Sequence, residues 1–252
     1  MIHDLSTMTS PEAHEAVQRS QTAVIPVGSI EQHGPHLPNG TDTFAAKLIA
    51  RGVAERMDAV YVPFSPYGVS PIHAGHPGTV SLRPETFEAL LTDVCAELIA
   101  AGVRTVVLVN WHEGNISSMN RVATELQDRH KVVFVAAQAC YTAQRIYRPE
   151  GGELTHGGGI ETLAVLAQDK ELVKVERAGE PTRPEGAHEL DAMRRSPEVY
   201  GFVTDVSELA DAGWYGDPTW ASTDRAGTFV DDVANEVVRL AESVVAAHRS
   251  RG

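Results

Sequence analysis

Short runs of apolar, β-branched residues alternate along the first half of the chain with segments whose apolar residues recur at helical spacing. The runs predict buried strands at residues 22–28, 59–63, 104–110 and 131–136. The intervening segments predict helices at residues 10–20, 43–57, 83–101 and 117–129. Strands that alternate with helices form βαβ units, so we expect an α/β fold with a mostly parallel central sheet.

The second half of the chain is less regular. Residues 147–159 are rich in glycine and lead into a predicted helix that runs to about residue 167. Residues 177–222 contain several prolines and many charges, so we interpret them as an irregular excursion on the surface. Residues 223–248 predict a final amphipathic helix. No repeat or low-complexity tract is visible, and we expect one domain over residues 1–252.

The composition limits the classes of partner. A formal net charge of −13 argues against nucleic acid and against an anionic membrane surface, because both need a positive footprint. The sequence has no apolar run long enough to predict a membrane span, and the N-terminus lacks the pattern of a signal peptide. Cys95 and Cys140 are the only cysteines, and we expect buried thiols and not a disulfide. A cytoplasmic protein is therefore the expectation.

Candidate chemistry begins directly after the first predicted core strand. The loop from Gly28 to Asp42 holds Glu31, His33 and Asp42, and His112 follows another predicted strand. Since ligands gather at the carboxyl ends of parallel strands, these side chains can meet in one crevice. Carboxylates and imidazoles together suit Zn²⁺, Mn²⁺ or Fe²⁺, so we predict a metal site. A polar turn with solvated side chains is the alternative for any single member.

The number of metal ions stays open at this point. Asp42 has two oxygens and could bridge two ions about 3.5–4 Å apart, whereas one catalytic zinc needs only three protein ligands. Glu161 is the best remaining ligand, although the helix dipole also favours a solvated carboxylate in a first helical turn. Either centre suits hydrolysis of an amide-like bond.

Two further residues are candidates for catalysis. His156 lies in a glycine-rich loop five residues before Glu161, and an imidazole can act as general acid or base near neutral pH. Glu113 follows His112 directly and could be a metal ligand, a proton acceptor or a residue that orients a ligand.

Other side chains could line a substrate pocket. We select His76 and Trp111, ahead of His73, although packing or surface hydrogen bonding is the alternative for each. The sequence contains no phosphate-binding glycine loop of the Rossmann or Walker type and no Gly-x-Ser-x-Gly elbow. Neither cysteine has a catalytic pattern around it, so serine- and cysteine-hydrolase chemistry is not expected.

Four segments resemble the creatininase (creatinine amidohydrolase) family. Residues 27–38, followed by Thr41-Asp42-Thr43, are similar to its long first motif, and residues 76–82 to its Phe/His-Pro-Gly-Thr-x-Ser-Leu segment. Residues 110–115 (Asn-Trp-His-Glu-Gly-Asn) resemble its Asn-Gly-His-Gly-Gly-Asn element. Residues 156–162 (His-Gly-Gly-Gly-Ile-Glu-Thr) resemble its His-Ala/Gly-Gly-x-x-Glu-Thr element.

The resemblance implies a three-layer α/β/α fold, a binuclear centre of Zn, Mn or Fe, and homo-oligomers that are often hexameric. It implies a set of metal ligands in which Asp42 is the bridge, namely Glu31, His33, Asp42 and His112. By the same resemblance, Glu161 matches the glutamate of the last motif and His156 matches a histidine near the substrate.

The chain departs from creatininase itself at three positions. That enzyme has an acidic ligand where this chain has Gly114, so either Glu113 or Glu161 completes the second metal site or the second ion is bound weakly. It has a tyrosine where this chain has Glu113, and a tryptophan where this chain has Gly152. Those aromatics hold the creatinine ring, so creatinine is not the expected substrate.

We therefore expect a metal-dependent amidohydrolase that uses metal-bound hydroxide on a small polar amide, cyclic amide or formamide, at C–N bonds other than peptide bonds. Other family branches similar to this chain are a formylaminopyrimidine deformylase, a peptidase that trims the mycofactocin precursor, and a hydrolase of keto-inositols. Hydrolysis of a cyclic keto-sugar or lactone, and peptidase activity of the mycofactocin-precursor type, stay as alternatives. A scaffold without activity is disfavoured because the ligand set is intact.

Overall fold

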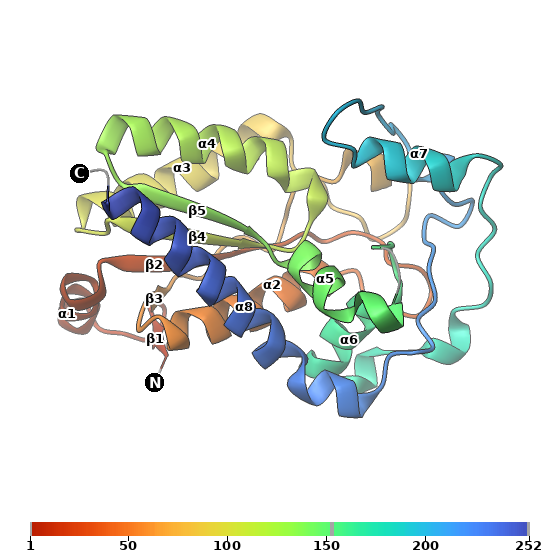
Figure 1. Cartoon of the computed structure of the whole chain (residues 1–252), viewed down its shortest axis with the longest axis horizontal. Coiled ribbons are helices and arrows are strands. Elements are labelled where there is room, and N and C mark those ends of the chain that lie inside the picture. Colours follow the sequence, from red (N-terminus) through yellow and green to blue (C-terminus); the bar gives the residue numbers. More distant parts are fainter. Residues whose placement is uncertain (1, 152–153, 251–252) are drawn as a thin grey trace.

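The computed structural model describes residues 2–151 and 154–250 (Figure 1). Five strands form one sheet in the order β1-β3-β2-β4-β5, and every neighbouring pair is parallel. The strands are β1 (His3–Asp4), β2 (Thr22–Val27), β3 (Val60–Tyr61), β4 (Thr105–Asn110) and β5 (Val133–Gln138). The parallel sheet expected from the alternation of strands and helices is confirmed.

Helices cover both faces of this sheet (Figure 1). One core contains side chains of α1 (Ser10–Ser20), α3 (Pro84–Ala100) and α4 (Ile116–His130). The other contains side chains of α2 (Thr41–Arg56), α5 (Ala139–Gly151), α6 (Gly159–Gln168) and α8 (Thr223–Arg249). The fold is thus a three-layer α/β/α arrangement, as expected.

The central strands are apolar without interruption because both of their faces are buried. In β2, Ala23 and Ile25 belong to the core on the α3 side, and Val24 belongs to the core on the α8 side. This division follows from the alternation of side chains across a strand. The carboxyl ends of β2 and β4 therefore lie side by side, held by a ladder that reaches Val27 and Asn110.

Three elements differ from the sequence expectations. α5 was not expected, because the glycine-rich segment that follows it is typical of a loop. β1 is too short to be recognised from its two residues. α7 (Ala187–Arg194) lies within residues 177–222, which were expected to be an irregular surface excursion. That region instead forms a small core of its own around Leu209, Ala210 and Tyr215.

Other expectations have simpler outcomes. Both cysteines are buried free thiols, as predicted. Among the helices that the structure describes, none has the length and apolar character needed to cross a bilayer. Gly152, at which the family places a tryptophan, lies outside the described residues. One domain over residues 1–252 stays a prediction.

Candidate metal centre

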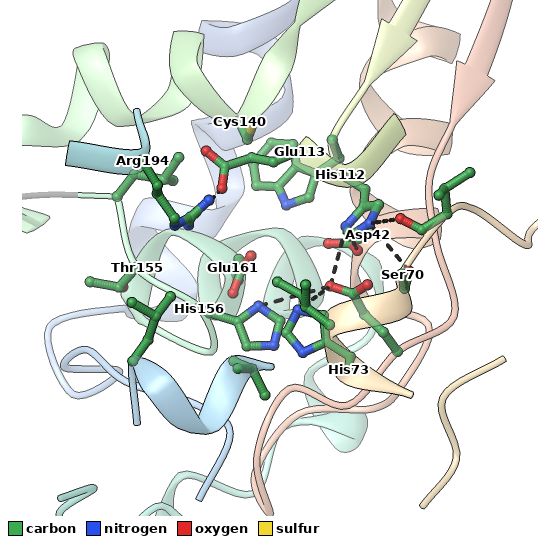
Figure 2. A pocket seen from close by; sticks show the side chains of 18 of the residues that line it. Asp42, Ser70, His73, His112, Glu113, Cys140, Thr155, His156, Glu161 and Arg194 are labelled. Atoms are coloured by element: carbon green, nitrogen blue, oxygen red, sulfur yellow. Dashed lines mark hydrogen bonds and ion pairs between the residues drawn. The ribbon is translucent and has the colours of Figure 1, made fainter. Parts of the chain in front are cut away.

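Segments far apart in the sequence meet beyond the carboxyl ends of β2 and β4 (Figure 2). Glu31 and His33 lie in the loop after β2, and His112 lies two residues beyond the end of β4. Asp42 and Glu161 lie in the first turns of α2 and α6, where the helix dipole favours a carboxylate. α2 begins at Thr41, two residues earlier than expected, so Asp42 is a helical residue and not part of the loop.

A glycine at position 28 allows the loop and α2 to approach each other. A Cβ atom on Gly28 would lie 2.6 Å from the Cα of Thr43, so any other residue would push the end of β2 away from the helix. The Thr43 hydroxyl donates to the carbonyl of Ser29 at 2.9 Å. These contacts hold the start of α2, and with it Asp42, against the loop that carries Glu31.

The five predicted ligands form two groups that share Asp42. Glu31, Asp42 and His112 offer atoms within 4.8 Å of one another, and so do His33, Asp42 and Glu161. Asp42 Oδ1 lies 3.2 Å from His33 Nε2, and Asp42 Oδ2 lies 3.2 Å from His112 Nδ1. All five side chains are buried. One carboxylate therefore stands between two imidazoles.

Backbone hydrogen bonds determine which ring nitrogens face the carboxylates. His33 Nδ1 donates to the carbonyl of Glu31 at 3.0 Å, and His112 Nε2 donates to the carbonyl of Val69 at 2.9 Å. In these tautomers His33 Nε2 and His112 Nδ1 carry lone pairs toward the carboxylate oxygens. Two facing acceptors repel each other unless a metal ion or a proton lies between them.

Buried acceptors without donors agree with this arrangement. Glu31 Oε2, His33 Nε2 and Asp42 Oδ2 have no hydrogen-bond partner within residues 2–151 and 154–250. Such orphaned groups are costly in a protein interior and call for an ion or water. Because the donor set combines carboxylate oxygens with imidazole nitrogens, it fits Zn²⁺, Mn²⁺ or Fe²⁺.

The ionisation states of the cluster depend on one another. Burial alone would lower the pKa of His33, but the carboxylates of Asp42 and Glu161 raise it well above its usual value. Burial alone would raise the pKa of Asp42, but the rings of His33 and His112 hold it well below its usual range. Burial raises the pKa of Glu161. The carboxylates of the cluster are thus balanced either by protons on the imidazoles or by metal ions.

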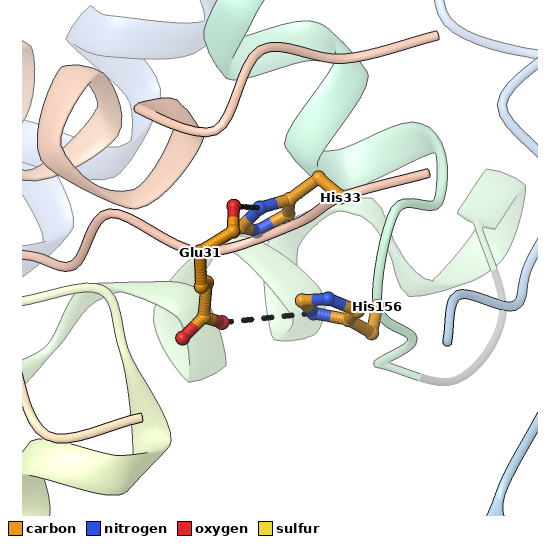
Figure 3. A group of neighbouring side chains, drawn as sticks. All are labelled: Glu31, His33 and His156. Carbon is orange, nitrogen blue, oxygen red and sulfur yellow. Dashed lines mark hydrogen bonds and ion pairs between the residues drawn. The ribbon is translucent and has the colours of Figure 1, made fainter. Parts of the chain in front are cut away.

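His156 stands beside the cluster, with its ring near Glu31 and His33 (Figure 3). Its Nε2 donates to the carbonyl of Gln32 at 2.7 Å, so Nδ1 keeps its lone pair and faces Glu31 Oε1 at 3.9 Å. Burial and the rings of His33 and His73 lower the pKa of His156 well below its usual value. A neutral imidazole with a free nitrogen therefore lines the cavity.

Glu113 is surrounded by two arginines and a tyrosine. Its carboxylate accepts hydrogen bonds from Arg195 Nε at 2.7 Å, from Arg195 Nη2 at 3.0 Å and from the Tyr141 hydroxyl at 2.6 Å. Arg194 Nη2 lies 2.8 Å from the same group. Burial opposes its ionisation, but the two arginines lower the pKa of Glu113 to about 2. Glu113 belongs to none of the candidate ligand groups among the described residues.

Gly114 explains why no acid follows His112 at the position of the creatininase ligand. A Cβ atom at this position would overlap the carbonyl oxygen of Val69 and the His112 ring. No side chain fits on this backbone, and the carboxylate that lies with His33 and Asp42 is that of Glu161 at the start of α6.

Of the two residues predicted to contact a substrate, one lines the cavity and the other does not. Trp111 lines the cavity that contains the ligand cluster, which has a volume of about 240 Å³. His76 does not line this cavity among the described residues, and its ring lies against Gly213 instead. His73, which we ranked lower, is buried in the cavity with Nε2 at 3.6 Å from Glu31 Oε1. The 3₁₀ turn Pro71–His73 directs it inward, and the sequence spacing gave no sign of this turn.

The sequence analysis also missed one wall of the cavity. Arg194 and Arg195, at the end of α7, line it together with Glu113 (Figure 2). They were overlooked because their segment was interpreted as a solvated surface. An acid three and four residues before them, Asp191, was the available signal, since this spacing pairs charges along a helix.

Comparisons with known proteins identify the family of this chain. The family model described as "Creatininase: Creatinine amidohydrolase" matches residues 6–241. The chain is 40% identical over 238 residues to a mycofactocin precursor peptide peptidase of Mycolicibacterium smegmatis, covering 92% of this chain and 87% of that protein. It is 37% identical over 107 residues to a 3-dehydro-scyllo-inosose hydrolase of Thermotoga maritima, covering 42% of this chain and 34% of that protein.

The fold agrees with solved structures as well. A structure described as "Creatininase Mn" superposes with a TM-score of 0.77 at 23% identity, covering 97% of this chain and 99% of that chain. At this identity the superposition establishes the fold, which is the three-layer arrangement described above.

Proposed function

Because this chain belongs to the creatininase family, we propose that it is a metal-dependent hydrolase that cleaves a C–N bond in a small polar amide, cyclic amide or formamide. The observation that carries the proposal is the pair of ligand groups that share Asp42, with both imidazoles oriented by backbone carbonyls. A cavity of about 240 Å³ opens onto these groups and suits a small substrate.

Two divalent ions fit these groups. We propose that Glu31, Asp42 and His112 hold one, and that His33, Asp42 and Glu161 hold the other. Such ions, when bound, polarise a carbonyl and lower the pKa of water.

We assign His156 the movement of the proton to the leaving nitrogen. Its Nε2 is held by the carbonyl of Gln32, which directs Nδ1 toward the cavity. The loop that carries it is held by His36, whose Nε2 donates to the carbonyl of Gly157 at 2.7 Å. Gly157 N in turn donates to Glu161, so the proton carrier and a proposed ligand share one support.

We assign Glu113 a positioning role and no proton transfer. Its oxygens accept from Tyr141 and Arg195 and pair with Arg194, which leaves them no capacity for a substrate proton. The ion pair joins the turn after β4 to α7 and so shapes one wall of the cavity.

A second candidate function is peptidase activity, which the 40% identity to a mycofactocin precursor peptide peptidase favours. The small cavity suits the end of a peptide better than its middle. The restriction to C–N bonds other than peptide bonds is therefore part of our proposal. Assembly as a homo-oligomer, a hexamer by family resemblance, and a cytoplasmic location stay predictions.

The test uses protein stripped of metal by a chelator and reloaded with Zn²⁺, Mn²⁺ or Fe²⁺. A panel of cyclic amides, formamides, short peptides and cyclic keto-sugars is incubated with it, and released amine and opened ring are measured separately. Asp42→Ala is the test variant. Asp4→Asn is the control, since Asp4 is a buried, ion-paired acid on β1, outside the cavity lining.

We expect metal-dependent release of amine from a small amide, lost in Asp42→Ala and kept in Asp4→Asn. Release from peptides alone would favour the peptidase. Opening of a keto-sugar without amine release would contradict the C–N bond assignment. Turnover that survives removal of metal would contradict the metal-dependent mechanism.

A further inference from the structure

Among the described residues, one wall of the cavity has free hydrogen-bond donors but no free acceptor on its carboxylate. Beside the metal ligands lies a wall formed by Trp111, Glu113, Arg194 and Arg195. Figure 2 shows the Arg194 guanidinium and the Glu113 carboxylate pointing toward each other along this wall. The groups on the wall that remain available decide what part of a substrate can bind there.

The carboxylate on this wall has no capacity left. A carboxylate has about four acceptor sites. Glu113 Oε1 accepts from the Tyr141 hydroxyl and from Arg195 Nε, while Oε2 accepts from Arg195 Nη2 and lies 2.8 Å from Arg194 Nη2. A substrate donor or cation would have to displace one of these charge-assisted bonds.

Donors, in contrast, remain available. Arg194 has five N–H donors. Its Nε donates to Asp191 at 2.8 Å, its Nη2 pairs with Glu113, and the Tyr215 hydroxyl is a third neighbour. At least two donors therefore have no acceptor among the residues that the structure describes. Trp111 Nε1 is a further donor without a partner in this part of the chain, although the ring is 2% exposed.

The wall also carries a net positive charge, which favours an anionic group as the acceptor for these free donors. Three arginines, Arg183, Arg194 and Arg195, surround only two carboxylates, those of Glu113 and Asp191. One positive charge is thus uncompensated within this network. Asp191 does not line the cavity, whereas Arg194 and Arg195 do.

From this geometry we propose that the substrate carries a carboxylate, which Arg194 binds while the scissile carbonyl lies at the metal ligands. The planar guanidinium matches a carboxylate with two parallel N–H groups. The inference rests on the proposed function for the position of the scissile bond. It narrows the substrates to small amides with an acidic group, such as N-acyl amino acids.

The test measures binding and not turnover. The probes are 4-oxopentanoate and 5-hydroxypentan-2-one, which have the same chain length and a ketone but no C–N bond. The first probe ends in a carboxylate, and the second ends in a neutral alcohol. Their dissociation constants are measured by calorimetry on the metal-loaded protein, for wild type, Arg194→Gln and Arg51→Gln. Arg51 is a matched control, because it forms an ion pair with Asp4 away from the cavity.

We expect wild type to bind 4-oxopentanoate about tenfold more tightly than the alcohol, or more, as a charge-assisted bond implies. Arg194→Gln should bring the two constants within about threefold of each other, and Arg51→Gln should keep the wild-type ratio. Equal constants in wild type would overturn the proposal. So would a ratio that survives in Arg194→Gln, because the metal ions would then be the partner of the carboxylate.

Two features keep the result interpretable. If Arg194→Gln does not fold, Arg194→Lys keeps the charge but loses the planar fork, and its ratio should lie between those of wild type and unity. An unchanged ratio in Arg194→Lys would overturn the role of the fork. Because no bond is cleaved, a failed amide assay would contradict the proposed function and leave this result standing.

Discussion

Asp42 Oδ2 lies 3.2 Å from His112 Nδ1, and neither atom carries a proton when a neutral His112 ring donates from Nε2 to the carbonyl of Val69. Asp42 Oδ1 has the same relationship to His33 Nε2, whose ring donates from Nδ1 to the carbonyl of Glu31. A single carboxylate thus faces two lone pairs. Without metal ions, protons on these nitrogens would offset the repulsion, since the carboxylates raise the pKa of both imidazoles, and two metal ions would take the place of those protons with Asp42 as a bridge.

The first prediction concerns this bridge. Asp42→Ala should remove more metal and more activity than any other single ligand change, because its loss affects both ions. We expect the affinity for each ion to fall by more than the roughly 10–100-fold typical of an outer-shell partner. Elemental analysis after dialysis measures it, with Asp4→Asn as control. A variant that kept two ions and near-normal turnover would rule out the bridge.

Glu161 should affect one ion only. Its Oε1 lies 3.7 Å from His33 Nε2, and it belongs to one of the two groups that contain Asp42. Glu161→Gln keeps size and helix propensity, so the fold should persist while one ion binds weakly and the other normally. If Glu161 were only a carboxylate at the start of a helix, the change would lower the free energy of unfolding by about 0.3–1 kcal/mol and leave the metal content unchanged. Metal titration of the variant separates these outcomes.

Glu113 should affect stability and leave metal content alone. Glu113→Gln removes the charge that Arg194 and Arg195 share, and we expect the free energy of unfolding to fall by about 2 kcal/mol. Tyr141→Phe, which removes a single hydrogen bond to Glu113, should cost about 1 kcal/mol. Denaturant unfolding and elemental analysis check both effects. Loss of one ion in Glu113→Gln would make Glu113 a ligand after all.

The cysteines should be inert in the folded protein at moderately alkaline pH. Burial raises the pKa of Cys95 from 9.0 to about 12, and burial also raises that of Cys140 well above its usual value. A higher pKa disfavours the reactive thiolate, so at pH 8 only roughly one Cys95 in 10⁴ is ionised. An aromatic disulfide reagent should detect both thiols after unfolding and neither before it. Rapid native reaction of either thiol at pH 8 would contradict this burial.

Residue types and strand order were enough to predict that the proposed ligand side chains lie close together. Glu31, His33 and His112 follow parallel strands, whose carboxyl ends must meet at one edge of the sheet. Asp42 was selected correctly for proximity, yet its place in the first turn of α2 depends on Gly28 and its contact with Thr43. That contact joins residues 15 positions apart, which no periodicity reveals.

The opposite wall could not be predicted from local patterns. The pairing of Glu113 with Arg194 joins residues 81 positions apart, and the fold alone brings them together. Taken separately, Glu113 follows a predicted ligand and resembles a catalytic acid, while Arg194 and Arg195 resemble solvated surface charges. Local patterns also failed to show that His73 lines the cavity and His76 does not. The 3₁₀ turn Pro71–His73 determines which of the two rings enters it.

The central claim is a binuclear centre bridged by Asp42, and anomalous X-ray scattering from crystals of the Zn²⁺- or Mn²⁺-loaded protein tests it most directly. The account predicts two anomalous peaks about 3.5–4 Å apart, one beside Glu31 and His112, the other beside His33 and Glu161, with Asp42 between them. A single peak, or peaks that leave Asp42 outside the first shell of either ion, would contradict it.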